Sequence, residues 1–267
     1  MKTFRIIGMV LMAVLMCVNF TSCSKDDDDF SGDGSNIPKN TIRYQTKDGI
    51  IVRFENEDVF GGAKIISNTY STTNGYGTIE FASEVTAIEK NAFKYQDKLS
   101  SITLPNSIVS IGDYAFLCCK NLTSISIPNS VTSIGREAFN DCNGLTSVTI
   151  PNCVTSIGYR TFAYCRNLTS VTISNSITNI AGEVFFYCTN LKSITIPNSV
   201  TNIGNSAFRN CVGLKSIYLM GTTPPSVGTD NFTDYHYKNI TIYIPKGSLE
   251  AYQSAYVWKE FKNIQEI

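Results

Sequence analysis

The chain has 267 residues, and its 22 basic and 22 acidic side chains give a formal net charge of zero. A nucleic-acid-binding protein of this size normally carries a basic excess, so we expect no nucleic-acid partner. Only 16% of the residues are charged and 43% are apolar, which predicts a buried core beneath a surface of Ser, Thr and Asn. The single histidine, His236, argues against histidine-based metal sites and offers a catalytic triad only one base.

Residues 1–22 are predicted to be a lipoprotein signal peptide. Lys2 and Arg5 precede an uncharged apolar run from Ile6 to Phe20, whose 15 residues fall short of a membrane span. The alternative is an uncut membrane anchor. Phe20-Thr-Ser-Cys23 resembles a bacterial lipobox, which makes Cys23 the expected site of lipidation.

Residues 23–37 are predicted to be an acidic, flexible tether. The run Asp26–Asp29 follows the cysteine closely. It is similar to the surface-export signal of Bacteroidetes lipoproteins, although clustered like charges also suit a solvated spacer. We therefore expect an exported outer-membrane lipoprotein that faces the cell exterior and contacts the membrane through its lipid anchor.

A 23-residue period runs through the middle of the chain. It is carried by one leucine per repeat: Leu99, Leu122, Leu145, Leu168, Leu191 and Leu214. Repeats 1 to 5 span 99–121, 122–144, 145–167, 168–190 and 191–213. A weaker leading copy begins at Tyr76, and a partial copy from Leu214 loses the pattern at Pro224-Pro225.

Each repeat has the pattern of a short strand, a turn and a short helical turn. In repeat 2, Ile125 and Ile127 alternate with serines, which predicts a half-buried strand that ends before Pro128. Ala138, Phe139 and Cys142 have the spacing of a short helical turn. No repeat can bury these residues alone, so the repeats are predicted to stack as a solenoid.

Two columns of the repeat are predicted to be buried. The aromatic column is Phe93, Phe116, Phe139, Phe162, Phe185 and Phe208. The thiol column is Cys119, Cys142, Cys165, Cys188 and Cys211. We expect these cysteines to be reduced and packed as small apolar side chains, and the neighbouring Cys118 to be partly exposed.

The phrase Ile127-Pro-Asn-Ser-Val-Thr-Ser-Ile-Gly, followed by Ala-Phe and Cys, resembles the BspA-like leucine-rich repeats of Bacteroides-type surface lipoproteins. The resemblance covers 76–219. It implies an α/β solenoid, a leucine-rich-repeat right-handed superhelix with short parallel strands and short helical turns, capped at both ends. Some relatives are adhesins for host proteins. Ser174, Ala181 and Cys153 depart from the pattern and put the local turn of repeat 4 in doubt.

The flanks, 38–75 and 220–267, are predicted to be an N-terminal β cap and a C-terminal cap. Asp48-Gly49 predicts a hairpin that joins strands 42–46 and 50–54, and Asn74-Gly75 predicts a second tight turn. At the other end we expect a strand at 240–244. A helix capped by Ser248 should follow, with Leu249, Tyr252, Ala255 and Tyr256 on one face.

No catalytic residue, metal site or cofactor is predicted. The chain has no phosphate-binding glycine loop, zincin helix or nucleophile elbow. Glu137 and Asp141 lie four residues apart but suit solvated surface charges. His236 is expected to be an exposed loop residue.

Two surfaces remain as candidate contact sites. The lateral patch comprises Tyr159, Arg160, Tyr164, Arg166, Phe186 and Tyr187. The alternative is the strand face: Thr103, Ser126, Thr149, Thr172, Thr195 and Tyr218. Interface hot spots favour Tyr and Arg over Thr and Ser, so the lateral patch is preferred.

The leading functional hypothesis is a non-catalytic protein- or glycan-binding module, an adhesin for a host or microbial surface macromolecule. The alternative is a structural or accessory spacer within a surface complex. An enzyme ranks last, because no acidic or histidine residues converge on a pocket in the sequence pattern.

Overall fold

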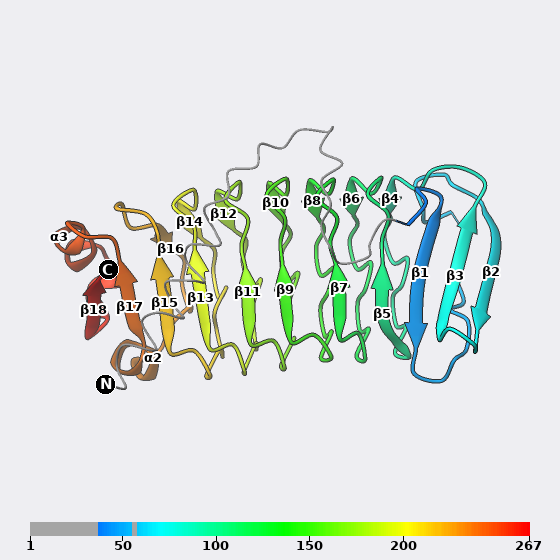
Figure 1. The fold of residues 1–267 in the computed structure, drawn as a ribbon. Coiled ribbons are helices and arrows are strands. Elements are labelled where there is room, and N and C mark those ends of the chain that lie inside the picture. Colours follow the sequence, from blue (N-terminus) through cyan, green and yellow to red (C-terminus); the bar gives the residue numbers. More distant parts are fainter. Residues whose placement is uncertain (1–36, 55–57) are drawn as a thin grey trace, which may run out of the picture. The chain divides into compact units, whose positions relative to one another are not determined.

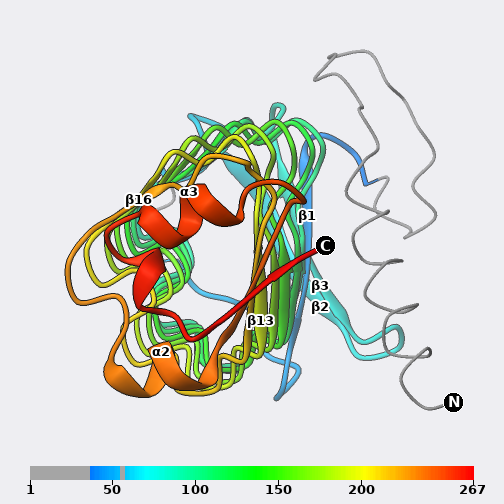
Figure 2. The same ribbon diagram turned by 90° about the vertical axis from the view of Figure 1, so that its left-hand side faces the viewer.

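The computed structural model describes residues 37–54 and 58–267. The signal peptide, Cys23 and all but the last residue of the predicted tether lie outside these ranges. The described chain is a stack of coils, which we call rungs, and Figure 1 shows one rung following another along the sequence. The view turned by 90° in Figure 2 shows the rungs superimposed around a common core.

Each rung contributes a strand of three to five residues to a first sheet. These strands are β5 (Leu99–Thr103), β7 (Ser124–Ser126), β9 (Ser147–Thr149), β11 (Ser170–Thr172), β13 (Ser193–Ile196), β15 (Ser216–Leu219) and β17 (Thr241–Ile244). Neighbours pair in parallel one repeat apart, as Val148 pairs with Val171. The ladder runs without a break from β9 to β17 and ends at β18 (Asn263–Glu266), whereas β5 and β7 pair with each other but, within residues 58–267, β7 does not pair with β9.

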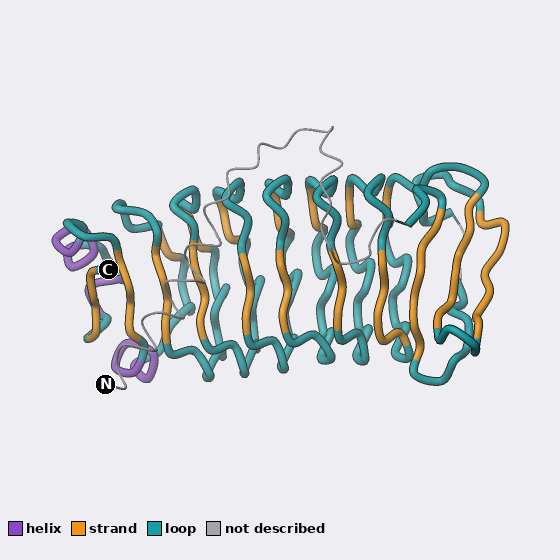
Figure 3. The backbone as a smooth tube through the Cα atoms, viewed as in Figure 1, coloured by secondary structure: helices purple, strands orange, loops and turns teal. Residues whose placement is uncertain are grey.

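A second, shorter sheet runs along the other side of the rungs. Its two-residue strands are β4 (Ala87–Ile88), β6 (Ser110–Ile111), β8 (Ser133–Ile134), β10 (Ser156–Ile157), β12 (Asn179–Ile180), β14 (Asn202–Ile203) and β16 (Ser226–Val227). The isoleucines point inward and are buried, while the Ser and Asn side chains face outward. The remainder of each rung is turn, as Figure 3 shows.

The predicted aromatic column lies in the core, which confirms that part of the prediction. All six phenylalanines are fully buried. Their rings stack face to face from rung to rung, with centroid separations from 5.1 Å for Phe93–Phe116 to 6.0 Å for Phe162–Phe185. The stack continues beyond the repeats to Phe232, 6.0 Å from Phe208. A continuous column supports the solenoid because every rung buries its ring against the next.

The segments expected to form helical turns are runs of hydrogen-bonded turns instead. In repeat 2, Glu137 and Asp141 have positive φ values of 52° and 58°. The amide of Cys142 bonds within the rung to Phe139, whereas the amide of Phe139 bonds to Thr161 O of the next rung at 2.9 Å. A residue with positive φ interrupts a right-handed helix, and amides that bond to the next rung cannot close helical turns.

Glycine follows most of the second-sheet strands and allows adjacent rungs to approach closely. The amide of Gly135 donates to Ile111 O at 2.7 Å, and a Cβ on Gly135 would lie 2.6 Å from Asp113 N. Ala181 occupies the equivalent position in repeat 4. Within the described ranges its amide makes no bond to Ile157, and β10 and β12 do not pair. The extra methyl group of Ala181 accounts for this seam in the second sheet.

The other departure in repeat 4 leaves its turn intact. Ser174 replaces proline, and Ile177 N still donates to Ser174 O at 3.3 Å, as Val131 N donates to Pro128 O at 3.0 Å in repeat 2. The buried Ser174 hydroxyl bonds to Val154 O of the preceding rung at 2.9 Å. The serine therefore keeps the turn and satisfies its own polar atom.

At the N-terminal end, β1 (Thr41–Thr46) lies inside the first sheet. It pairs antiparallel with β3 (Tyr76–Phe81) on one side and with β5 on the other. Residues 50–54 form no strand, so the predicted hairpin at Asp48-Gly49 is wrong, because β1 finds its partners far along the chain. The turn at Asn74-Gly75 is confirmed: it joins β2 (Ile65–Ser71) to β3.

The C-terminal end is closed by α2 (Asp234–Asn239), α3 (Leu249–Ser254) and the 3₁₀ helix η2 (Trp258–Glu260). Ser248 precedes α3, but the carboxylate of Glu266 is the group that accepts from Gly247 N, Ser248 N and Leu249 N, at 2.8–3.2 Å. Tyr252 is buried, whereas Tyr256 lies beyond the helix end and is 84% exposed. The expectation that Tyr256 shares the buried face is wrong for that reason.

Candidate binding surfaces

Two side chains of the lateral patch, Arg160 and Tyr159, converge on a carboxylate that the sequence did not single out. The guanidinium of Arg160 lies 2.6 Å from Glu183 Oε2, and the hydroxyl of Tyr159 donates to Glu183 Oε1. The same guanidinium lies 5.1 Å from the Tyr159 ring and 5.9 Å from the Phe186 ring. The bond to Glu183 raises the pKa of Tyr159.

The aromatic side chains of the patch form a second cluster. Tyr164 stacks on Tyr187 with centroids 5.3 Å apart, and both contact Phe186 edge to face at 5.4 and 4.8 Å. These rings are half-buried, so each still presents area to solvent. Arg166 is exposed, and its side chain is not part of this ring cluster; its backbone amide donates to Asn143 Oδ1 at 3.1 Å.

Arg136 joins the patch from the preceding rung. Its guanidinium lies 5.2 Å from the Tyr159 ring and makes an ion pair with Glu137 at 3.1 Å. The repeat pattern carries a signal for this contact, because Arg136 and Tyr159 are one 23-residue period apart. Glu183 and Arg160 are related in the same way. The stacking of equivalent positions therefore predicts which surface side chains meet.

The predicted strand-face residues share one exposed column of the first sheet. Thr103 pairs with Ser126, and Thr149, Thr172, Thr195 and Tyr218 pair in succession. The column continues into Tyr243, whose ring stacks on that of Tyr218 at 4.6 Å. Burial raises the pKa of Tyr218. Most of the face thus offers small hydroxyls, with aromatic area concentrated at its C-terminal end.

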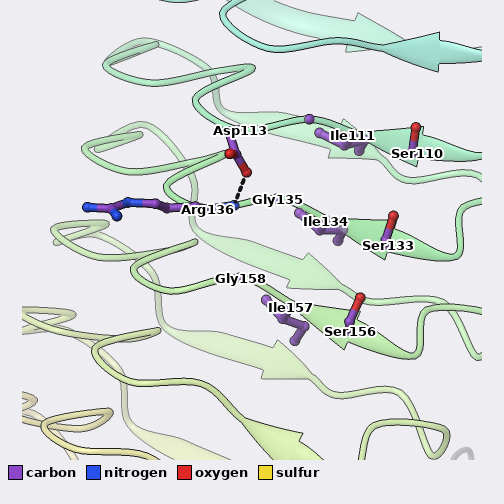
Figure 4. A pocket seen from close by; sticks show the side chains of 11 residues that line it. Ser110, Ile111, Asp113, Ser133, Ile134, Gly135, Arg136, Ser156, Ile157 and Gly158 are labelled. Carbon is purple, nitrogen blue, oxygen red and sulfur yellow. Dashed lines mark hydrogen bonds between the residues drawn. The ribbon is translucent and has the colours of Figure 1, made fainter.

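A shallow groove of about 460 Å³ lies along the second sheet, and Figure 4 shows it from close by. Ser110, Ser133 and Ser156 point outward in a row, and the backbone of Gly135 and its equivalents forms the floor. Asp113 Oδ1 accepts from Arg136 N at 2.7 Å. The carboxylate is therefore used in holding two rungs together.

The thiol column is buried and reduced, as predicted, but its members are also hydrogen-bond donors. Cys142 Sγ lies 3.1 Å from Phe116 O, and the other four cysteines contact the equivalent phenylalanine carbonyl at 3.0–3.2 Å. Burial raises the pKa of Cys165 and of Cys211 to about 12. Cys118 is partly exposed, as expected.

The prediction that His236 is an exposed loop residue is wrong. His236 lies in α2 and is 2% exposed, because the C-terminal segment folds back over the last rung. Its Nδ1 accepts from Thr233 N at 3.1 Å, and in the part of the chain that the structure describes Nε2 has no partner with hydrogen-bond geometry. Burial lowers the pKa of His236, and the nearby Lys215 adds to this effect.

The described residues bring together no group of three or more His, Cys, Asp or Glu side chains suited to a metal. Of the helices in those ranges, none has the length and apolar content to cross a membrane. The geometry is that of a repeat scaffold with exposed lateral and strand surfaces.

Residues 63–192 and 181–267 match the BspA type leucine-rich repeat region, in six copies. The chain belongs to this family. A leucine-rich repeat protein of T. pallidum is similar in structure, with 30% identity over 55% of this chain and 68% of that chain and a TM-score of 0.52.

Two further solved structures are similar at lower TM-scores. A leucine-rich repeat protein from Bacteroides ovatus is 20% identical, covers 75% of this chain and 67% of its own, and has a TM-score of 0.41. A leucine rich cell surface protein from Faecalibacterium prausnitzii is 26% identical, covers 61% of this chain and 59% of its own, and has a TM-score of 0.45. No curated protein matches the chain.

Proposed function

We propose that this chain is a non-catalytic binding module that uses the lateral patch as its contact surface. One observation carries the proposal: aromatic and arginine side chains from two consecutive repeats meet on one surface, half-exposed, around Glu183. Such side chains supply most of the binding energy at protein interfaces. The strand face offers mainly threonine and serine, which rarely do.

The partner we propose is a host or microbial surface macromolecule, protein or glycan, which would make the chain an adhesin. The chain belongs to a family with a cell-surface relative, which supports a location at the cell surface, where such a partner is met. The lipobox-like segment before Cys23 supports an outer-membrane lipoprotein that faces the exterior. Replacing Cys23 by Ala should abolish acyl labelling and membrane fractionation; a variant that still partitions with membranes would refute the anchor.

The contact surface is tested with an array of matrix proteins and glycans, probed first with the unaltered chain. We expect Arg160→Ala with Tyr187→Ala to lose binding to any ligand found, by about tenfold or more. The matched control, Thr149→Ala with Thr172→Ala, should bind as the unaltered chain does. The reverse pattern would move the site to the strand face.

A spacer within a surface complex is the second candidate, and one observation favours it. The bonds of Arg160 and Tyr159 to Glu183 join the two rungs whose second-sheet strands, β10 and β12, do not pair. The patch could therefore serve stability. Arg160→Lys separates the two roles: it keeps the charge but removes the planar fork, so a lower melting temperature with unchanged binding would support the spacer.

A further inference from the structure

The insertion of β1 into the first sheet creates a surface that the repeats do not provide. Alternation along the strand buries Ile42 and Tyr44 and leaves Arg43 and Gln45 on the outer face. Arg43 lies opposite Thr103 of repeat 1 and opposite Thr78 of β3. The outward column that contains Thr103 and Ser126 therefore extends to Arg43. Among the described strands, Arg43 is the one cation in this column.

Arg43 borders a hollow of about 250 Å³. The hollow is lined by Ile37, Arg43, Tyr44, Gln45, Tyr76, Ser101 and Thr103. The guanidinium lies 5.9 Å from the Tyr76 ring, which fixes its orientation without neutralising its charge. In the described ranges no carboxylate makes an ion pair with Arg43. Glu80, an exposed acidic residue of β3, accepts a hydrogen bond from Ser67 at 3.1 Å.

The other polar groups of the hollow are arranged to donate. Gln45 Oε1 accepts from the Ser101 hydroxyl at 2.8 Å, which leaves the two N–H bonds of the Gln45 amide free to donate. Thr103 and Tyr76, which also line the hollow, each carry a hydroxyl group. A guanidinium, an amide nitrogen and two hydroxyls match the oxygens of a carboxylate.

We propose that this hollow binds the carboxylate of an acidic sugar, a uronic acid within an oligosaccharide. Charge complementarity selects the carboxylate, because within residues 37–54 and 58–267 Arg43 has no acidic partner and lies beside groups that can donate. The adjoining column selects the sugar: Thr103 and Ser126 offer uncharged hydroxyls to a chain that is itself rich in hydroxyls. This site lies on the strand face and shares no residue with the lateral patch. An experiment can therefore refute one of the two proposals without refuting the other.

The test is calorimetric titration of the purified full chain with trigalacturonate and with its methyl ester, which is the same trisaccharide without charge. We expect the acid to bind at least tenfold more tightly than the ester, and Arg43→Gln to remove this difference. Arg43→Lys should recover only part of it, because lysine lacks the bidentate fork. Arg209→Gln, which removes an exposed arginine elsewhere, should change nothing.

Circular dichroism and the melting temperature of each variant establish that the fold is kept. Equal binding of acid and ester, no binding of either, or acid binding by Arg43→Gln equal to that of the unaltered chain would overturn the proposal. Triglutamate provides the peptide arm: if it binds more tightly than trigalacturonate, the site recognises acidic peptides and the sugar assignment is wrong.

Discussion

The thiol of Cys142 donates a hydrogen bond to the carbonyl oxygen of Phe116, 3.1 Å away in the preceding rung. The same contact recurs at every cysteine of the column, so each thiol links two rungs inside the core. Cysteine combines a small apolar side chain with a weak donor, and both properties are used at this position.

Replacing Cys142 by Ala should therefore lower the free energy of unfolding by roughly 1–3 kcal/mol, through lost packing and a lost hydrogen bond. Urea denaturation under reducing conditions measures the change. Cys118→Ala is the matched control, since that side chain is partly exposed, and it should cost less than about 0.5 kcal/mol. Equal costs for the two variants would mean that the column contributes no special stability.

The thiol column should resist modification in the folded chain. Burial raises the pKa of Cys165 and Cys211 to about 12, so neither forms appreciable thiolate at pH 8. We expect a thiol reagent to label Cys118 slowly and the five column cysteines only after denaturation, as read by mass spectrometry of labelled peptides. Disulfides between neighbouring rungs would contradict this expectation.

Adding a side chain at Gly135, where the backbones of two rungs lie close together, should destabilise the stack of rungs. A Cβ there would lie 2.6 Å from a backbone nitrogen of the preceding rung, which cannot move aside as a side chain would. Gly135→Ala should cost about 1–3 kcal/mol in thermal or urea unfolding. The reciprocal change, Ala181→Gly, should be nearly neutral or stabilising; a large loss there would show that the seam does not arise from the alanine methyl group.

The stability of the C-terminal cap should depend on His236 at mildly acidic pH. Burial holds the pKa of His236 below its usual 6.5, so the folded chain favours the neutral ring. Stability is then complete above about pH 6.5 and falls as the pH drops from that value toward the folded pKa. Protonation of Nδ1 would also remove the acceptor for Thr233 N.

The measurement is unfolding free energy against pH, together with the proton resonance of the ring. Because the chain has one histidine, its titration is observed without overlap. His236→Phe should flatten the pH dependence below about pH 6.5. A folded-state pKa at or above 6.5 would refute this account.

The repeat period made much of the molecule predictable. Once Leu122 and Leu145 define the period, the inward direction of Phe139 and Cys142 follows from stacking alone. The pairing of β1 could not be predicted in this way, because its partner strands at 76–81 and 99–103 lie far along the chain and no local sequence pattern identifies them. His236 was misplaced for a similar reason: it lies beyond the periodic region, and its burial depends on how α2 and η2 close the last rung.

The same limit applies to the surfaces. Arg160 and Tyr159 were identifiable as residue types, but Glu183 enters only when equivalent positions of successive repeats are compared. The spacing of Ala138, Phe139 and Cys142 predicts a helical turn, because the same spacing fits both a helix and the turns that the structure contains. Which amides bond to the next rung is decided by stacking, and spacing within one repeat does not contain that information.

The position of β1 has a mechanical consequence. A force applied to the chain ahead of Thr41 would act along β1, and the strand is held by antiparallel ladders to β3 and β5 on both sides. Such a load shears both ladders at once, whereas a terminal edge strand could peel away one hydrogen bond at a time. The strand that follows the predicted tether is thus held on both sides against a force applied through that tether.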